Sequence, residues 1–150
     1  MALIYSKPRL KNLSVGSRIA FVRQFRRMTR HELALKIGLS KKNAKRIMAR
    51  YERSKKVPKE DKLQKIAEIL NINVSMIRPY DFSEPSDLYY LMLWAEELCP
   101  NFIMRRSYSA DSENETQCFF SEHYVQWRKM RKKYMNNEIS YEEYWDWKLK

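Results

Sequence analysis

Glycine is nearly missing from this chain of 150 residues, which contains only Gly16 and Gly38. Loops that cradle the phosphates of a bound nucleotide need several glycines, because the backbone must approach the phosphates closely. The sequence therefore excludes the glycine-rich loops of nucleotide hydrolases and of dinucleotide-dependent dehydrogenases. Paired carboxylates such as Glu96 and Glu97 have no histidine or metal ligand at a useful spacing, so we expect that the protein is not an enzyme.

Cysteine and histidine are also scarce, with two residues of each. Cys99 and Cys118 lack the spacing of a metal-binding or redox pair. His31 and His123 have no other ligand close to them in the sequence, and a structural zinc site needs four clustered ligands. We expect no metal, no cofactor, and two buried free thiols rather than a disulfide.

Long apolar runs are absent as well. No segment approaches the roughly 18 apolar residues that a membrane-spanning helix requires. Lys7, Arg9 and Lys11 interrupt the short apolar start of the chain, which is unlike the apolar core of a signal peptide. We therefore expect a cytoplasmic protein that has no membrane partner.

Positive charge is what the chain has in excess, with a formal net charge of +12. Residues 1–78 hold 21 Lys or Arg and 5 Asp or Glu, a balance of +16, whereas residues 79–150 hold 9 and 13, a balance of −4. This asymmetry predicts one half that binds a polyanion and another half with a different task.

Two short helices are predicted between Met28 and Ser54. Thr29 is a good N-cap, and Glu32 three positions later completes a capping box. Gly38 suits the end of this helix, because glycine accepts a positive φ without a steric penalty, and Ser40 would cap the next helix. From residue 44 onwards, apolar side chains recur at three and four residues and predict an amphipathic helix. The other face of this second helix carries four basic residues: Lys42, Lys45, Arg46 and Arg50.

A helix is also predicted on each side of this pair. The first has Ser14 or Ser17 as its N-cap and has Ile19, Val22 and Phe25 on its apolar side. Another begins near Pro58 and ends near residue 70, and a last short helix follows from Val74. The other faces of the first helix carry four arginines: Arg18, Arg23, Arg26 and Arg27.

Five segments form an ordered series within residues 14–78: Gly16-Ser-Arg-Ile-Ala, Met28-Thr-Arg-His-Glu-Leu-Ala, Gly38-Leu-Ser, Tyr51-Glu-Arg and Lys65-Ile-Ala-Glu-Ile-Leu-Asn-Ile. Together they resemble the helix-turn-helix domain of phage repressors of the Cro and lambda-repressor type. This resemblance implies a domain of about five helices that binds operator DNA, usually as a dimer. The chain also resembles a subgroup of such regulators from low-GC Gram-positive bacteria, which has an additional C-terminal domain.

The chain departs from this family in two ways. Arg30 stands where the family usually has glutamine, and the spacing between Gly38 and Tyr51 is about one helical turn longer. The longer spacing leaves two registers open for the side chains that reach the bases. Alignment backwards from Tyr51 favours Lys45, Arg46 and Arg50, whereas alignment forwards from Gly38 favours Lys41, Lys42 and Asn43.

The basic helix and the resemblance together predict two sets of DNA contacts, one with bases and one with phosphates. By the resemblance, the loop after the basic helix would contact the phosphate backbone. The candidates for reading bases are Lys42, Asn43, Lys45, Arg46 and Arg50. The candidates for binding phosphates are Thr29, Arg30, Lys41, Arg53, Lys55 and Lys56.

The predicted fold is mainly α and has two domains. A five-helix helix-turn-helix domain occupies residues 14–78, a proline-containing linker occupies residues 79–86, and a small α+β domain occupies residues 87–150. The α+β domain is predicted to contain a helix, a two-stranded hairpin and two further helices. Its strands would be residues 102–109 and 116–120. The helix before them would bury Leu88, Leu91, Met92 and Ala95 and would expose Glu96 and Glu97.

The C-terminal half is rich in aromatic residues and contains all four tryptophans. An ordinary core stapled by aromatic side chains is the first interpretation of this composition. Beyond it we expect a homodimer or protein-partner surface, or else a pocket for an effector that changes DNA affinity. The basic residues from 128 to 133 could add a second contact with a polyanion.

From these features we expect a sequence-specific DNA-binding transcriptional regulator. It would act as a repressor that binds double-stranded DNA at a promoter operator through the major groove. The alternative is an antitoxin-like protein whose N-terminal domain binds its own operator and whose C-terminal part binds a protein partner. A toxin-like neighbouring gene would favour the antitoxin, and phage or conjugation genes would favour the regulator of a mobile genetic element. An RNA-binding module is a third hypothesis.

Overall fold

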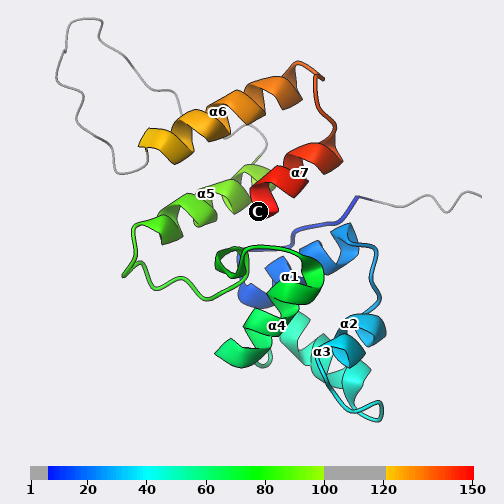
Figure 1. Cartoon of the computed structure of the whole chain (residues 1–150). Helices are drawn as coiled ribbons and strands as arrows, with labels where there is room; N and C mark the ends of the chain where they lie inside the picture. Colours follow the sequence, from blue (N-terminus) through cyan, green and yellow to red (C-terminus); the bar gives the residue numbers. More distant parts are fainter. Residues whose placement is uncertain (1–6, 100–120) are drawn as a thin grey trace, which may run out of the picture. The chain divides into compact units, whose positions relative to one another are not determined.

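The computed structural model describes residues 7–99 and 121–150, and the chain divides into two compact units between Tyr80 and Asp81. Helices and loops make up the whole of these two ranges, and they contain no strand (Figure 1). None of the helices in this part of the chain is long and apolar enough to cross a membrane. The elements in order are α1 Val15–Phe25, α2 Arg30–Lys36, α3 Ala44–Glu52, α4 Glu60–Leu70, the 3-10 turn η1 Val74–Met76, α5 Ser86–Leu98, α6 Ser121–Met135 and α7 Tyr141–Leu149.

The predicted cap of α2 is confirmed, and of the two serines that the sequence offers for α1, Ser14 is the N-cap. The Ser14 hydroxyl accepts a hydrogen bond from the backbone N–H of Ser17 at 3.2 Å. At α2 both halves of the capping box are present, because the Thr29 hydroxyl accepts from the Glu32 N–H and the Glu32 carboxylate accepts from the Thr29 N–H. Each cap satisfies backbone donors that have no partner within the helix.

The start of α3 differs from the prediction. The backbone carbonyl of Ser40 accepts hydrogen bonds from the N–H groups of Asn43 and Ala44, at 3.0 and 2.8 Å. Residues 41–43 therefore form a turn, and the helix begins only at Ala44. The prediction that Ser40 caps this helix is wrong, since Asn43 occupies the N-cap position and makes no side-chain capping bond.

Two arginines of α1 lie inside the N-terminal unit, although the sequence pattern placed them on exposed faces. Arg18 is 2% exposed and donates to the backbone carbonyls of Met76 and Arg78, at 2.8 and 2.9 Å. Its guanidinium also lies 4.2 Å from the centre of the Tyr80 ring. Arg18 thus holds η1 and the end of the unit against α1. The fifth helix that was expected is this single 3-10 turn.

An apolar core fills the space between α1, α2, α3, α4 and η1. The members of this core come from every one of these elements, and most of them have no exposed surface, so the helices are fixed against one another. They are Ile19, Phe21, Val22, Leu33, Ala34, Ile37, Ala44, Met48, Leu63, Ile66, Ala67, Leu70, Met76 and Ile77.

The prediction of an α+β fold for the C-terminal domain is wrong, because the described part of this unit is helical throughout. The two segments predicted as strands, residues 102–109 and 116–120, lie outside the described residues. The chain as a whole is mainly α.

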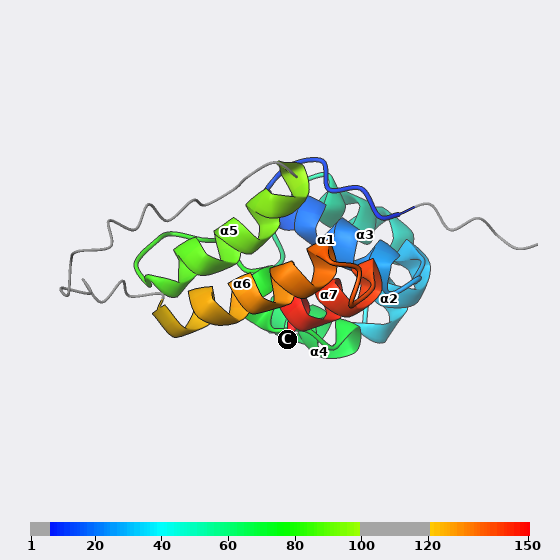
Figure 2. The same ribbon diagram turned by 90° about the horizontal axis from the view of Figure 1, so that it is seen from above.

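The three helices of the C-terminal unit bury aromatic and apolar side chains around a polar centre, and the aromatic core expected from the sequence is present: Leu93, Trp94, Trp127, Tyr144, Trp145 and Leu149 are buried. α5 and α6 run in the same direction (Figure 2). Near their starts the ring centroids of Tyr89 and His123 are 5.1 Å apart, and near their ends Glu96 pairs with Arg131. The predicted buried face of α5 is wrong. Leu88 is 41% exposed, whereas Glu96 and its neighbour Glu97 receive hydrogen bonds from α6 and α7. Hydrogen bonds from the later helices satisfy these carboxylates, so the two glutamates can be partly buried.

Candidate nucleic-acid interface

The α3 helix has one buried face and one basic face. Ala44 and Met48 have no exposed surface, and Tyr51 is 5% exposed. Because a helix turns by about 100° per residue, positions 45, 46, 49, 50 and 53 lie together on the opposite side. Four of these five positions are Lys or Arg and are exposed, and the fifth is the small, half-buried Ala49: the four are Lys45, Arg46, Arg50 and Arg53.

These basic groups are largely uncompensated. Among residues 7–99 and 121–150, no carboxylate forms an ion pair with Lys45, Arg46 or Arg50. The Arg46 guanidinium donates one hydrogen bond, to the side-chain oxygen of Asn43 at 3.1 Å. A helix face without acidic partners keeps its positive potential for a polyanion.

The other predicted base contacts lie just before this face. Lys41, Lys42 and Asn43 form the turn that leads into α3, and the two lysines are exposed. Asn43 is half-buried, and its side-chain oxygen accepts a hydrogen bond from Arg46, so a residue of one register contacts a residue of the other. The two alternative sets of base-reading residues therefore adjoin each other at the N-terminal end of α3.

Thr29 and Arg30 have local partners that the sequence did not reveal in full. The Thr29 hydroxyl is already engaged as the cap of α2, and hydrogen bonds from Thr29 hold the pKa of Glu32 below its usual value. Arg30 donates from Nε to Glu52 at 2.6 Å, while its side chain remains 39% exposed. Both residues stand at the start of α2, where exposed donors could meet a phosphate.

Glu52 is a structural residue that the sequence reasoning treated only as part of a motif. Its side chain is 2% exposed and accepts from Arg23 with both carboxylate oxygens, as well as from Arg30. Arg23 also donates to the backbone carbonyl of Met28 at 2.7 Å. One carboxylate thus connects α1, the start of α2 and the end of α3. The signal in the sequence was weak, because Arg23 follows apolar residues of α1 as an exposed arginine would.

The loop after α3 carries the remaining predicted phosphate contacts. Arg53, Lys55 and Lys56 are all exposed. The loop is anchored, since the Ser54 hydroxyl donates to the Ser14 hydroxyl at 2.9 Å and the Lys55 N–H donates to the Arg50 carbonyl at 2.9 Å. The basic loop therefore keeps a fixed position beside the end of α3.

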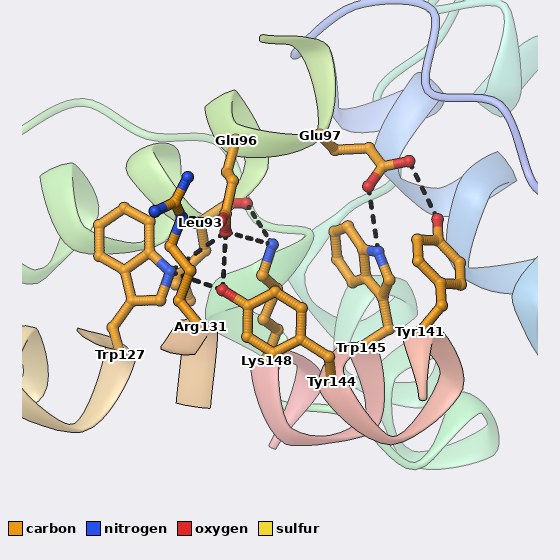
Figure 3. A network of polar contacts seen from close by, with 9 residues as sticks. All are labelled: Leu93, Glu96, Glu97, Trp127, Arg131, Tyr141, Tyr144, Trp145 and Lys148. Atoms are coloured by element: carbon orange, nitrogen blue, oxygen red, sulfur yellow. Dashed lines mark hydrogen bonds and ion pairs between the residues drawn. The ribbon is translucent and has the colours of Figure 1, made fainter. Parts of the chain in front are cut away.

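The C-terminal unit contains a polar network that joins its three helices (Figure 3). Glu96 accepts hydrogen bonds from the Trp127 indole and the Tyr144 hydroxyl, at 3.1 and 2.9 Å. It also pairs with Arg131 and with the buried Lys148, each at 2.7 Å. Glu97 accepts from two further aromatic side chains, Tyr141 at 2.9 Å and Trp145 at 3.1 Å.

The pKa values of the ionisable groups in this network are shifted by burial and by contacts between the three helices. Burial lowers the pKa of Lys148, and burial also raises the pKa of Tyr144. Burial raises the pKa of Glu96 as well, but the charge of Lys148 and hydrogen bonds from Lys148, Tyr144 and Trp127 outweigh it and leave this pKa lowered. Because the groups satisfy one another, we interpret the network as structural rather than reactive.

Metal-binding chemistry has no candidate site in the described ranges, where no three His, Cys, Asp or Glu side chains gather around a common point. Cys99 is free and exposed, so the expectation of a buried thiol is wrong for this residue, and Cys118 lies outside the described residues. Comparisons of the chain with models of known families, with curated proteins and with solved structures found no match.

Proposed function

We propose that this protein is a sequence-specific DNA-binding transcriptional regulator that represses a promoter from within the cytoplasm. The observation that carries the proposal is the basic face of α3, on which Lys45, Arg46 and Arg50 are exposed opposite a buried face. The major groove of DNA is about 12 Å wide and admits a helix of this kind.

The arrangement of side chains supports separate roles for the face and for its surroundings. Long basic side chains on α3 can donate to guanine, for which arginine and lysine are the commonest partners. Ala49 lies among them and is small enough to let the helix approach the bases. The base-reading set is completed by Lys42 and Asn43, and the exposed phosphate-binding set comprises Lys41, Arg53, Lys55 and Lys56, with Thr29 and Arg30 at the start of α2.

Repression would follow from occlusion of the polymerase at the promoter. A homodimer would place two copies of α3 in successive turns of the major groove, about 34 Å apart. Selection of bound fragments from genomic DNA, followed by footprinting, tests both statements. We expect one enriched sequence that has two symmetric half-sites, and a lack of any enriched sequence would contradict the proposal.

Arg46 offers a sharper test of the base contacts. Replacement by alanine should remove discrimination at one base pair, at a cost of about 1–3 kcal/mol for the selected sequence, and should leave nonspecific binding nearly intact. Lys65→Ala, at an exposed position of α4, is the matched control and should have little effect on either. If Arg46→Ala instead weakens binding to every sequence equally, Arg46 contacts the backbone and the base contacts come from the turn before α3.

A further inference from the structure

A groove of about 470 Å³ is formed by residues of α6, α7 and the loop between them. Three of the residues that line it are lysines of α6, Lys129, Lys132 and Lys133, and the α7 residue in the lining is Trp147. The volume lies within the range of about 300–1,000 Å³ that is typical of sites for small ligands. This groove has no part in the DNA interface described above.

The charges of the groove favour an anion. All three lysines are exposed, and no carboxylate in the described part of the chain is paired with any of them. The single carboxylate in the lining is Glu138, which accepts a hydrogen bond from the Asn136 amide at 3.1 Å. Like charges one helical turn apart repel each other, so an anion that entered the groove would relieve this repulsion.

Trp147 adds a flat surface and a hydrogen-bond donor. Its ring lies parallel to the Tyr144 ring, with an interplanar angle of 3° and centroids 6.1 Å apart, and Tyr144 stacks in turn on Tyr134 at 4.9 Å. The indole N–H groups of Trp127 and Trp145 donate to Glu96 and Glu97 respectively.

Trp147 differs from these two tryptophans. Within residues 7–99 and 121–150, its indole N–H has no hydrogen-bond acceptor and Tyr144 is its only ring neighbour. The residue is half-buried and lines the groove. The column of parallel rings therefore ends at a tryptophan beside three free ammonium groups.

We propose that this groove binds a nucleotide, with its base against Trp147 and its phosphates among Lys129, Lys132 and Lys133. Stacking on an aromatic side chain suits any base, because every base has a π face. Lysine ammonium groups bind phosphate as point charges and so replace the backbone donors of a glycine-rich loop. The same chemistry is offered by a free nucleotide and by a nucleotide within a single strand.

Binding of a fluorescent ATP analogue with an etheno-modified base tests the proposal. The fluorescence anisotropy of this probe rises when it binds the protein. Replacement of Lys129, Lys132 and Lys133 by glutamine in the full chain should weaken its binding at least about tenfold, since charge-assisted contacts are lost. The matched control also removes three positive charges, by replacement of Lys45, Arg46 and Arg50 of α3 by glutamine. We expect this control to lose duplex DNA binding and to keep nucleotide binding, and we expect the α6 variant to keep its selected duplex sequence.

The contribution of the ring is tested by Trp147→Leu, which should weaken binding about five- to hundredfold. Trp147→Phe retains a stacking surface and should bind more tightly than the leucine variant. Circular dichroism checks that each variant is folded. The lysine variants keep the test decisive if the leucine variant unfolds, because their side chains are exposed.

Competition experiments define the ligand. Single-stranded oligo(dA) and ATP compete with the probe in parallel, and whichever binds more tightly per nucleotide identifies the source. The proposal fails if the α6 variant binds the probe as well as the native chain does. It also fails if inorganic tripolyphosphate competes as well as ATP and the leucine variant binds normally, because the groove is then a basic surface without recognition of a base.

Discussion

Glu52 connects three helices of the N-terminal unit through a single carboxylate. It is almost fully buried and accepts hydrogen bonds from Arg23 of α1 and Arg30 of α2. A buried charge is tolerated only while it is paired, and the loss of one partner leaves the other charge without compensation. The position of α3 relative to α1 and α2 therefore depends on this carboxylate.

Replacement of Glu52 by glutamine should lower the free energy of unfolding by about 3–5 kcal/mol, because Arg23 would stay buried without a counter-charge. Urea denaturation followed by circular dichroism measures the loss. Glu60→Gln at the exposed start of α4 is the control and should lower stability by less than about 1 kcal/mol, because Glu60 interacts, within the described part of the chain, only with the helix dipole. Equal effects of the two substitutions would show that the buried ion pairs do not stabilise the unit.

Gly16 determines how closely α1 approaches the end of α3. A β-carbon at this position would lie 2.1 Å from the backbone oxygen of Tyr51 and 2.8 Å from that of Glu52. Backbone atoms cannot move aside as a flexible side chain can. The two helices would have to separate in order to accept any other residue.

The two glycines should consequently respond differently to alanine. Gly16→Ala should destabilise the protein by about 3 kcal/mol or more, because overpacking forces α1 and α3 apart. Gly38→Ala should cost only about 1–2 kcal/mol, because Gly38 has a φ of +81° but open space around the site of a β-carbon. Thermal unfolding compares the pair, and the interpretation is wrong if Gly38→Ala proves the more damaging.

Local features of the elements could be predicted from the sequence, whereas the polar centre of the C-terminal unit could not. The capping boxes depend on residues three positions apart, such as Thr29 and Glu32, and so they are visible in any short window. Glu96 was expected to face solvent because carboxylates usually do. Its partners stand between 31 residues (Trp127) and 52 residues (Lys148) further along the chain, and only folding brings them to it.

The same limit applies to the proposed DNA interface. The basic face of α3 could be predicted from periodicity, and Lys45, Arg46 and Arg50 are exposed as expected. The ion pair between Arg30 and Glu52 could not, because the two residues stand 22 positions apart. The turn at residues 41–43 could not be predicted either. Serine is a typical N-cap through its side chain, but here the backbone carbonyl of Ser40 accepts the hydrogen bonds from Asn43 and Ala44.

The joint between α5, α6 and α7 should be sensitive to acid. The charge of Lys148 and the hydrogen bonds to Glu96 outweigh its burial and hold the pKa of this carboxyl below its ordinary value of 4.5, so the carboxylate binds protons more weakly when folded than when unfolded. The stability that this difference provides is present above pH 4.5 and is lost as the pH falls through the lower folded value. Near-ultraviolet circular dichroism of the tryptophans should therefore report a loss of packing below pH 4.5.

Glu96→Gln isolates this effect. The variant should be less stable at neutral pH, where Lys148 loses its partner, and its stability should change less than that of the native protein between pH 5 and pH 3. Glu142→Gln, at an exposed position of α7, should keep the native pH dependence. Identical acid profiles for the native protein and Glu96→Gln would mean that other carboxylates control the transition.

At the scale of the whole molecule, charge and chemistry are divided between the two units. The N-terminal half carries the excess of positive charge and an exposed basic helix, whereas the C-terminal half is slightly acidic overall and concentrates its lysines on α6. Two separate clusters of exposed basic side chains therefore lie on one chain, and we propose a different anionic ligand for each. The contribution of each surface to DNA affinity can be separated through its dependence on salt.

Each phosphate that a basic side chain neutralises steepens the dependence of log K on log salt concentration by about 0.9. Replacement of both Lys55 and Lys56 by glutamine should therefore reduce the slope for duplex DNA by about 1.8, and the preferred sequence should stay the same if the loop binds only phosphates, as proposed. The control replaces two exposed lysines outside the loop, Lys65 and Lys150, and should leave the slope unchanged. Titration of the full chain with duplex DNA between about 50 and 200 mM salt measures the slopes. An unchanged slope in the loop variant would show that the phosphates are bound elsewhere, and an altered sequence preference would assign the loop to the bases.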